Sequence, residues 1–143
     1  MIRRSCALAT AVAAALAGSL EAAQFKTFGD VEVHYVVVNT TFLEPAIAEH
    51  YGLVRGRDRA FVNLSVVGPA GSLPAAAAGT ITNLLGQMTA LEFAEVREDP
   101  AVYYLAPFKF SDRETLRFSV RVELDDGTAH VVEFQETLYW EAR

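Results

Sequence analysis

Cysteine is nearly absent from this chain, since Cys6 is the only one among 143 residues. It lies in an uncharged, mostly apolar stretch, residues 6–17, that follows Arg3 and Arg4. A basic start, a short apolar stretch and small residues after it are typical of a secretory signal peptide. Once this leader is removed, the remaining chain can form no disulfide and can offer no thiolate to a metal ion. We therefore expect the domain to depend on its packed core for stability.

The chain also lacks a hydrophobic run long enough to span a membrane. The apolar stretch of the leader covers about a dozen residues, whereas a transmembrane helix needs about 20. We predict a cleaved signal peptide over residues 1–23 and a single domain over residues 24–143. The cleavage position stays open, because Ala17-Gly18-Ser19 fits the small-x-small pattern best and a cut after Ala22 or Ala23 also fits. Ser19 stands where a bacterial lipoprotein needs its lipidated cysteine, so we expect no membrane anchor after cleavage.

Basic residues are too few to suit a nucleic-acid-binding protein. The chain has 12 Lys and Arg against 18 Asp and Glu, a net charge of −6. Without Arg3, Arg4 and Glu21, which lie in the leader, 10 basic and 17 acidic residues remain, a net charge of −7. Nucleic acids and anionic lipid surfaces attract clustered lysine and arginine, so this balance argues against both as partners.

Helical patterns are equally scarce. Pro45–Tyr51 is the one segment with a helical pattern, because proline suits a first turn and Gly52 suits the residue after the last. Elsewhere apolar and polar residues alternate with the period of a half-buried strand. The expected strands cover residues 31–37, 60–66, 80–85, 89–96, 101–108 and 116–124, and a last strand begins at His130. We interpret residues 68–78, rich in glycine, proline and alanine, as a loop.

The register of the final hairpin can be predicted from its apolar pattern. A three-residue turn with Gly127 at its end pairs Val120 with Val132, and it joins apolar residues to apolar residues along both strands. The same register places Glu136 in the apolar stripe between Phe134 and Leu138. The sequence leaves open whether this carboxyl group is buried or reaches water at a bulge or a sheet edge.

About seven strands, short turns and one short helix favour a mainly β fold, an immunoglobulin-like antiparallel β-sandwich, with a small β-barrel as the alternative. The string Asp99–Tyr104 resembles the tyrosine corner of immunoglobulin domains, although Leu105 stands where those domains have a cysteine. A fold of this kind does not by itself indicate a function.

The mature chain as a whole resembles a known family. The stretches that carry the resemblance are Gly29–Tyr35, Asn39–Leu43, Ala48–Gly52, Arg59–Asn63, Asn83–Gln87, Tyr103–Tyr104 and Phe134–Thr137. They are similar to the domain of unknown function 4426, a family of uncharacterised periplasmic proteins of Gram-negative bacteria, over most of residues 25–143. The resemblance implies export to the periplasm, one domain and a β-rich fold. It implies no catalytic residues, because the activity of the family is unknown.

Residues typical of a catalytic or metal site are sparse and scattered. His34, His50 and His130 are too far apart in sequence for ligand spacing, and no serine lies in a G-x-S-x-G turn. We therefore predict no cofactor, no metal site and no catalytic residue. Acidic residues are plentiful, so an envelope hydrolase that uses a carboxylate pair is the alternative hypothesis.

The most distinctive cluster of positive charge in this acidic chain consists of Arg55, Arg57 and Arg59. Guanidinium groups bind carboxylates, phosphates and acidic protein surfaces, so we predict a candidate interaction loop here. The ordinary interpretation of such a run, which we favour, is a solvated loop in which Asp58 neutralises one charge, and the interaction loop is the candidate to test. The leading functional hypothesis is a non-enzymatic binding or protein-interaction module of the periplasm, with an envelope protein or a small anionic ligand as its partner.

Overall fold

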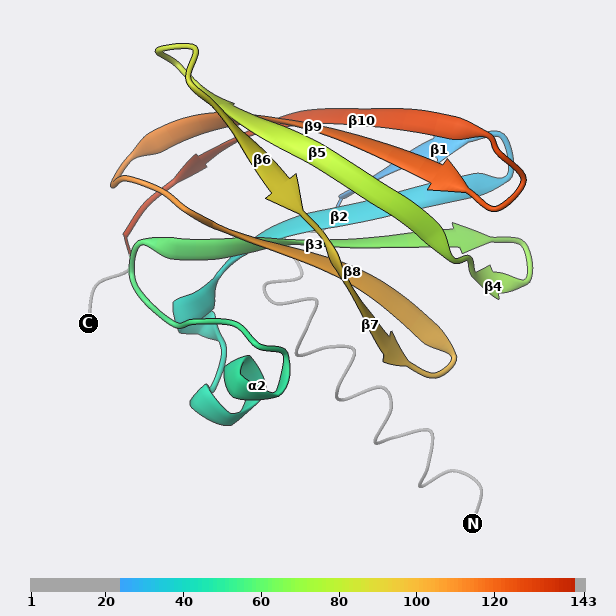
Figure 1. The fold of residues 1–143 in the computed structure, drawn as a ribbon, viewed down its shortest axis with the longest axis horizontal. Helices are drawn as coiled ribbons and strands as arrows, with labels where there is room; N and C mark the ends of the chain where they lie inside the picture. Colours follow the sequence, from blue (N-terminus) through green and yellow to red (C-terminus); the bar gives the residue numbers. More distant parts are fainter. Residues whose placement is uncertain (1–23, 141–143) are drawn as a thin grey trace.

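Strands dominate residues 24–140, the part of the chain that this computed structural model describes (Figure 1). The strands are β1 (Gln24–Phe28), β2 (Val31–Asn39), β3 (Arg59–Gly68), β4 (Gly71–Ser72), β5 (Ala75–Asn83), β6 (Met88–Glu92), β7 (Ala94–Glu98), β8 (Ala101–Lys109), β9 (Glu114–Leu124) and β10 (Ala129–Leu138). Two short helical segments, η2 (Thr40–Phe42) and α2 (Pro45–His50), lie between β2 and β3. The predicted leader, residues 1–23, lies outside the described residues.

The strands form two antiparallel sheets. Sheet A has the order β1-β2-β3-β8-β7, with the short β4 paired to β3, and sheet B has the order β10-β9-β5-β6. The two sheets lie in layers, with α2 below sheet A in Figure 1. The predicted mainly β sandwich is confirmed, and within residues 24–140 the strands close into no single barrel.

Alternating side chains of the two sheets fill the space between them. Val33, Val62, Leu64 and Val120, which the alternation places on inward faces, are fully buried. Aromatic rings cross the layer in a continuous row: Tyr35 stacks on Phe134 at 4.3 Å and Phe134 on Phe118 at 4.7 Å between ring centroids. Tight burial of this apolar surface is the main source of stability for a domain of this size.

A second, smaller core lies on the other face of sheet A. Val36, Val38 and Phe61 project from the sheet and pack against Leu43 and the residues of α2. This explains why β2 is buried on both faces along part of its length. No helix of the described residues has the length and apolar character needed to cross a membrane.

The predicted register of the final hairpin is confirmed. Val120 lies opposite Val132, Phe118 lies opposite Phe134, and the pairing between β9 and β10 runs without a bulge. Apolar residues therefore meet on one face of the hairpin, as expected from the preference for burying them together.

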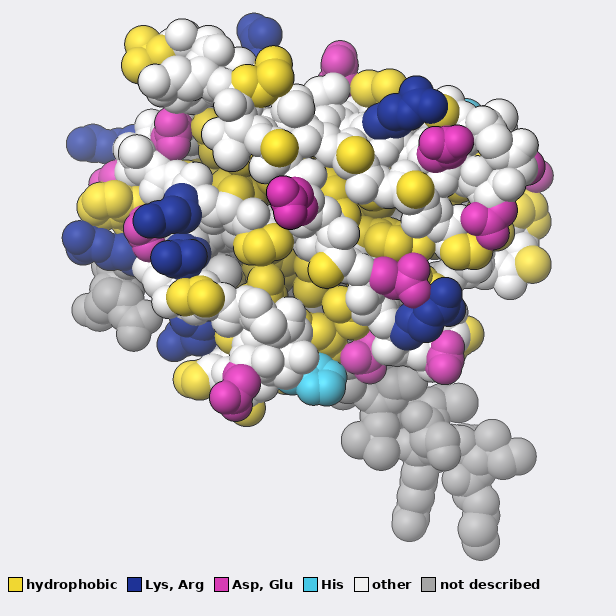
Figure 2. All heavy atoms as spheres, in the orientation of Figure 1, with side chains coloured by type: hydrophobic (Ala, Val, Ile, Leu, Met, Phe, Trp, Pro, Cys, Tyr) yellow, Lys and Arg dark blue, Asp and Glu magenta, His cyan; other side chains and the backbone are white. Residues whose placement is uncertain are grey.

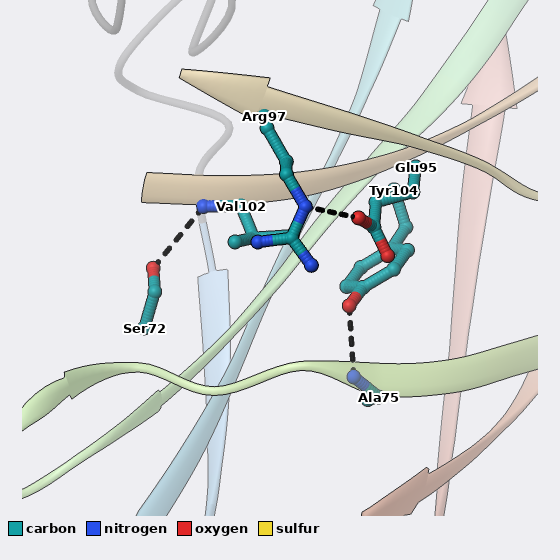
Figure 3. A network of polar contacts seen from close by, with 6 residues as sticks. All are labelled: Ser72, Ala75, Glu95, Arg97, Val102 and Tyr104. Atoms are coloured by element: carbon teal, nitrogen blue, oxygen red, sulfur yellow. Dashed lines mark hydrogen bonds and ion pairs between the residues drawn. The ribbon is translucent and has the colours of Figure 1, made fainter. Parts of the chain in front are cut away.

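The predicted loop over residues 68–78 is wrong in its second half. Residues 75–78, all alanine, are the first residues of β5, which runs between β6 and β9. The N–H of Ala75 donates a 2.8 Å hydrogen bond to the Tyr104 hydroxyl of β8, so β5 is tied to sheet A where it begins (Figure 3). Tertiary pairing overrides the weak strand propensity of alanine here.

The strand predicted over residues 89–96 is in fact two strands in different sheets. β6 pairs with β5 in sheet B, and after Phe93 the chain enters sheet A, where β7 pairs with β8. In the string Asp99–Tyr104, which resembles a tyrosine corner, the first two residues form the turn of the β7–β8 hairpin and the others begin β8, all within one sheet. It therefore differs from the corner between sheets that immunoglobulin domains have.

Glu136 is half-buried on the inward face of β10, opposite Leu116. Burial raises the pKa of its carboxyl group above the ordinary value, because the charged form loses solvation. With no bulge in the hairpin, the side chain reaches water only because β10 is an edge strand of sheet B.

We expect Glu136→Gln to stabilise the protein near neutral pH. A carboxyl group whose pKa is raised on folding stabilises the folded state while it is protonated, and this contribution is lost as the pH rises through the folded-state pKa. The advantage of the variant over the wild type in urea denaturation should therefore grow from about pH 4 to about pH 7. Glu133→Gln, on the exposed face of the same strand, is the matched control. An equal pH dependence for both variants would contradict the expectation.

Candidate interaction surface

The structure does not gather the three arginines of the predicted interaction loop into one cluster. The guanidinium of Arg55 donates hydrogen bonds to the carbonyl oxygens of Leu43, at 2.8 Å, and Thr41, at 3.2 Å. The guanidinium of Arg57 lies 4.4 Å from the centre of the Trp140 ring. Arg55 and Arg57 thus hold other parts of the chain in place, whereas Arg59 begins β3. A binding role for this loop stays a prediction.

The histidines are equally separate. The Nε2 atom of His34 lies 2.9 Å from a carboxylate oxygen of Glu32, and the ring of His130 stacks on Phe28. His50 lies 3.8 Å from Glu98. Among residues 24–140, no three His, Cys, Asp or Glu side chains are placed to hold a metal ion together.

One carboxylate and one phenol do meet, beside α2. The Tyr51 hydroxyl donates a 3.1 Å hydrogen bond to a carboxylate oxygen of Glu98. Burial, this hydrogen bond and the charge of Glu98 raise the pKa of Tyr51 to about 12. A phenol that stays protonated is poorly suited to act as a base near neutral pH. The pair therefore indicates a structural contact between α2 and β7.

The most exposed large apolar side chains are displayed by the turn between β5 and β6. Leu84 is 77% exposed and Leu85 is 85% exposed. The turn projects from the body of the molecule in Figure 1, and hydrophobic side chains gather there in Figure 2. Neither leucine belongs to either of the two cores of the described residues.

Asn83 holds this turn in a defined shape. Its side-chain oxygen accepts hydrogen bonds from the N–H groups of Leu85, at 3.0 Å, and Gln87, at 2.9 Å, and its side-chain nitrogen donates to Gln87 at 2.7 Å. Gly86 has a φ of +83°, which glycine adopts without strain. Such a turn presents its leucines at a low cost in conformational entropy on binding.

The same turn determines which residues of β6 form hydrogen bonds with β5. The N–H of Asn83 donates to the carbonyl of Gln87 at 3.0 Å. Since hydrogen-bonded and non-hydrogen-bonded pairs alternate along an antiparallel ladder, Thr89 and Leu91 are the β6 residues that bond to β5.

The intervening residues of β6, Met88, Ala90 and Glu92, direct their N–H and C=O groups away from β5. β6 is the last strand of sheet B, so within residues 24–140 these backbone groups pair with no further strand of that sheet. Unpaired groups in a row form a template for another extended chain. Charged side chains, in particular lysine, usually protect such edges from pairing with another chain. β6 carries a single charged residue, Glu92, at its end.

The other long edges are better protected. β7 continues the same side of the molecule and carries an ion pair in which the Nε atom of Arg97 lies 2.6 Å from Glu95 (Figure 3). β1 and β10, the outer strands on the opposite side, lie beside each other where Phe28 stacks on His130 at 4.4 Å. β6 is therefore the least protected edge of the sandwich.

A shallow hollow of about 560 Å³ lies beside β6 on the outer face of sheet B. Its outward-facing lining residues include Thr80, Thr82, Met88, Arg117 and Glu133. One basic and one acidic residue give the hollow mixed charge. We define the candidate interaction surface as the Leu84–Leu85 turn, the free edge of β6 and this hollow.

Sequence reasoning misses this surface. The alternation pattern places Leu84 and Leu85 at the end of a strand, where apolar residues are ordinary core candidates. The combination of Asn83 and Gly86 around two leucines is the available signal for a turn. The free edge of β6 has no signal, because it depends on the order of the strands.

Comparison with known proteins agrees with this fold. Residues 25–141 match the family described as Domain of unknown function (DUF4426). A crystal structure of the DUF4426 family protein PA0388 from Pseudomonas aeruginosa PAO1 is 35% identical, with a TM-score of 0.78, and the match covers 85% of this chain and 98% of that one. No curated protein matches the chain.

More distant structures share the fold alone. A copper-bound variant of FetP from uropathogenic Escherichia coli strain F11 is 13% identical with a TM-score of 0.62, covering 82% of this chain and 95% of that one. FetP from the same strain, expressed recombinantly in the periplasm, gives the same identity and TM-score, covering 85% and 96%. The family match spans most of the chain and PA0388 is a close relative, so the chain belongs to the DUF4426 family, as the resemblance implied.

Proposed function

We propose that this protein is an exported, non-enzymatic binding module of the periplasm that takes an extended segment of an envelope protein onto β6. The observation that carries the proposal is the free edge of β6 beside a rigid turn that displays two leucines. The signal-peptide pattern of residues 1–23 supports export.

The chemistry of the surface defines the partner segment. Three outward-directed residues of β6 offer backbone donors and acceptors to a neighbouring strand, which supplies affinity without sequence preference. Specificity would come from the two ends of β6. An apolar residue suits Leu84 and Leu85 near its start, and a basic residue suits Glu92 at its end.

Copper binding is not included in this proposal. The FetP variant is described as copper-bound, but at 13% identity the likeness concerns the fold. His34, His50 and His130 lie on different parts of the described chain and do not converge. A hydrolase finds no support either, since the hollow beside β6 is lined by a single acidic residue, Glu133.

The test is site-specific photo-crosslinking in living cells. A photoreactive residue at position 85 is expected to form a discrete adduct, whereas the same residue at Asp30, in the exposed β1–β2 turn, forms none. Ala90→Pro in the position-85 protein should reduce the adduct about tenfold, because proline removes the outward N–H of β6 and leaves the bonds to β5 intact.

Ala90→Val is the matched control, because it changes the side chain and keeps the N–H. It should retain the adduct, and the circular dichroism spectra of both variants should equal that of the wild type. Equal adducts in the folded Ala90→Pro protein, or the same adducts at Asp30 as at position 85, would contradict the proposal.

A further inference from the structure

Two cations stand opposite each other where β3 meets β8. Arg59 pairs directly with Lys109 at the end of the antiparallel ladder. Both side chains lie on the outer face of sheet A, because their neighbours Ala60 and Phe108 face the core. Within residues 24–140, neither the Arg59 guanidinium nor the Lys109 ammonium has an ion pair or a hydrogen bond.

This arrangement is unfavourable for an empty surface. Directly opposed residues have Cβ atoms about 5 Å apart, and like charges at that separation destabilise a sheet. The chain is acidic overall, with 18 acidic and 12 basic residues, so counter-charges are abundant elsewhere. An anionic ligand placed between the two cations would neutralise this repulsion.

The two cations line a cavity of about 250 Å³ between the end of the ladder and the loop that follows α2. Val54 and Pro107 form part of its wall, and no acidic residue lines it. Val54 is 61% exposed and contributes to neither core of the fold. The cavity thus joins a cationic end to an apolar wall.

We propose that this cavity binds a small organic carboxylate, with the carboxylate group between Arg59 and Lys109 and the apolar part against Val54 and Pro107. Arginine holds a carboxylate through two parallel hydrogen bonds, and lysine adds a third donor. A short aliphatic chain would cover the exposed surface of Val54. The site is separate from β6, so this inference does not depend on the proposed binding of a partner strand.

Lysine chemistry allows a direct test, because Lys26 and Lys109 are the only lysines of the chain. Reductive methylation with carbon-13 formaldehyde labels both lysines, together with the N-terminal amine, and keeps their charge. During titration with sodium butyrate, the signal of Lys109 should shift and saturate, while the signal of Lys26 stays fixed. Sodium chloride at the same ionic strength should move neither signal.

Two variants test the cationic end and the apolar wall of the cavity separately. Arg59→Gln should weaken butyrate binding about tenfold, the loss typical of one charge-assisted interaction. Val54→Ser should remove the preference for butyrate over acetate and keep binding of acetate. Arg59→Gln is expected to fold normally, with an unchanged or higher Tm in sodium chloride, because it relieves the repulsion between the two cations.

Three results would overturn the inference. The Lys109 signal could shift linearly with butyrate without saturating, which would indicate non-specific ion association only. Arg59→Gln could bind butyrate as tightly as the wild type. Sodium phosphate could saturate the Lys109 shift where butyrate does not, which would indicate an inorganic oxyanion site in place of a carboxylate site.

Discussion

Replacing Phe118 with alanine is expected to lower the free energy of unfolding by about 3–5 kcal/mol, the range for a fully buried phenylalanine. The side chain is 1% exposed and belongs to the aromatic row that it forms with Tyr35 and Phe134. Its ring stacks on Phe134 at 4.7 Å and meets Phe108 edge-on at 5.5 Å. The substitution removes the stacked pair and leaves a cavity that rigid strands on both sides cannot fill.

Urea denaturation followed by tryptophan fluorescence measures this loss. Phe25→Ala is the matched control, since Phe25 is 53% exposed on β1 and contacts the His34 ring. We expect the control to change stability by about 0.5 kcal/mol or less. A loss below about 1 kcal/mol for Phe118→Ala would mean that the two sheets do not pack around this residue.

Gly79→Ala is expected to cost about 1–3 kcal/mol, although it adds a single methyl group. The new Cβ atom would lie 2.6 Å from the backbone oxygen of Ser119 and 3.2 Å from the Cα atom of Val120. Backbone atoms of a paired strand cannot move aside without disturbing the ladder between β5 and β9. The glycine is needed because the two strands approach closely.

Gly68→Ala provides the control for this prediction. A Cβ atom at Gly68 would lie 2.8 Å from the Cδ1 atom of Leu73, which is the end of a flexible side chain. That side chain can rotate away, so thermal denaturation should show a smaller loss for Gly68→Ala than for Gly79→Ala. Equal losses at the two positions would contradict the close approach of β5 to β9.

The sequence predicts those parts of the fold that depend on local periodicity. Alternation places Val33, Val62 and Val120 on the inward faces correctly, and the apolar pairing of the last hairpin fixes its register. It fails at residues 75–78, because alanine has a low strand propensity and only pairing with β9 makes this segment a strand. It also fails at Phe93, where nothing local marks the change of sheet.

The candidate sites depend on contacts between distant residues, and this limits prediction from the sequence. The arginine cluster directs attention to Arg59, but its pairing with Lys109 follows only from the register of β3 and β8. The free edge of β6 follows from the order of four strands in sheet B. Both features join residues that no pattern in the chain connects.

Amide hydrogen exchange of the purified protein, measured by NMR, tests the free edge of β6 most directly. The amides of Thr89 and Leu91, which bond to β5, should exchange slowly, while those of Met88, Ala90 and Glu92 should exchange quickly. This alternation would establish that β6 offers an unpaired edge to a partner. Uniformly slow exchange along residues 88–92 would show that the edge is already covered and would contradict the proposed mode of binding.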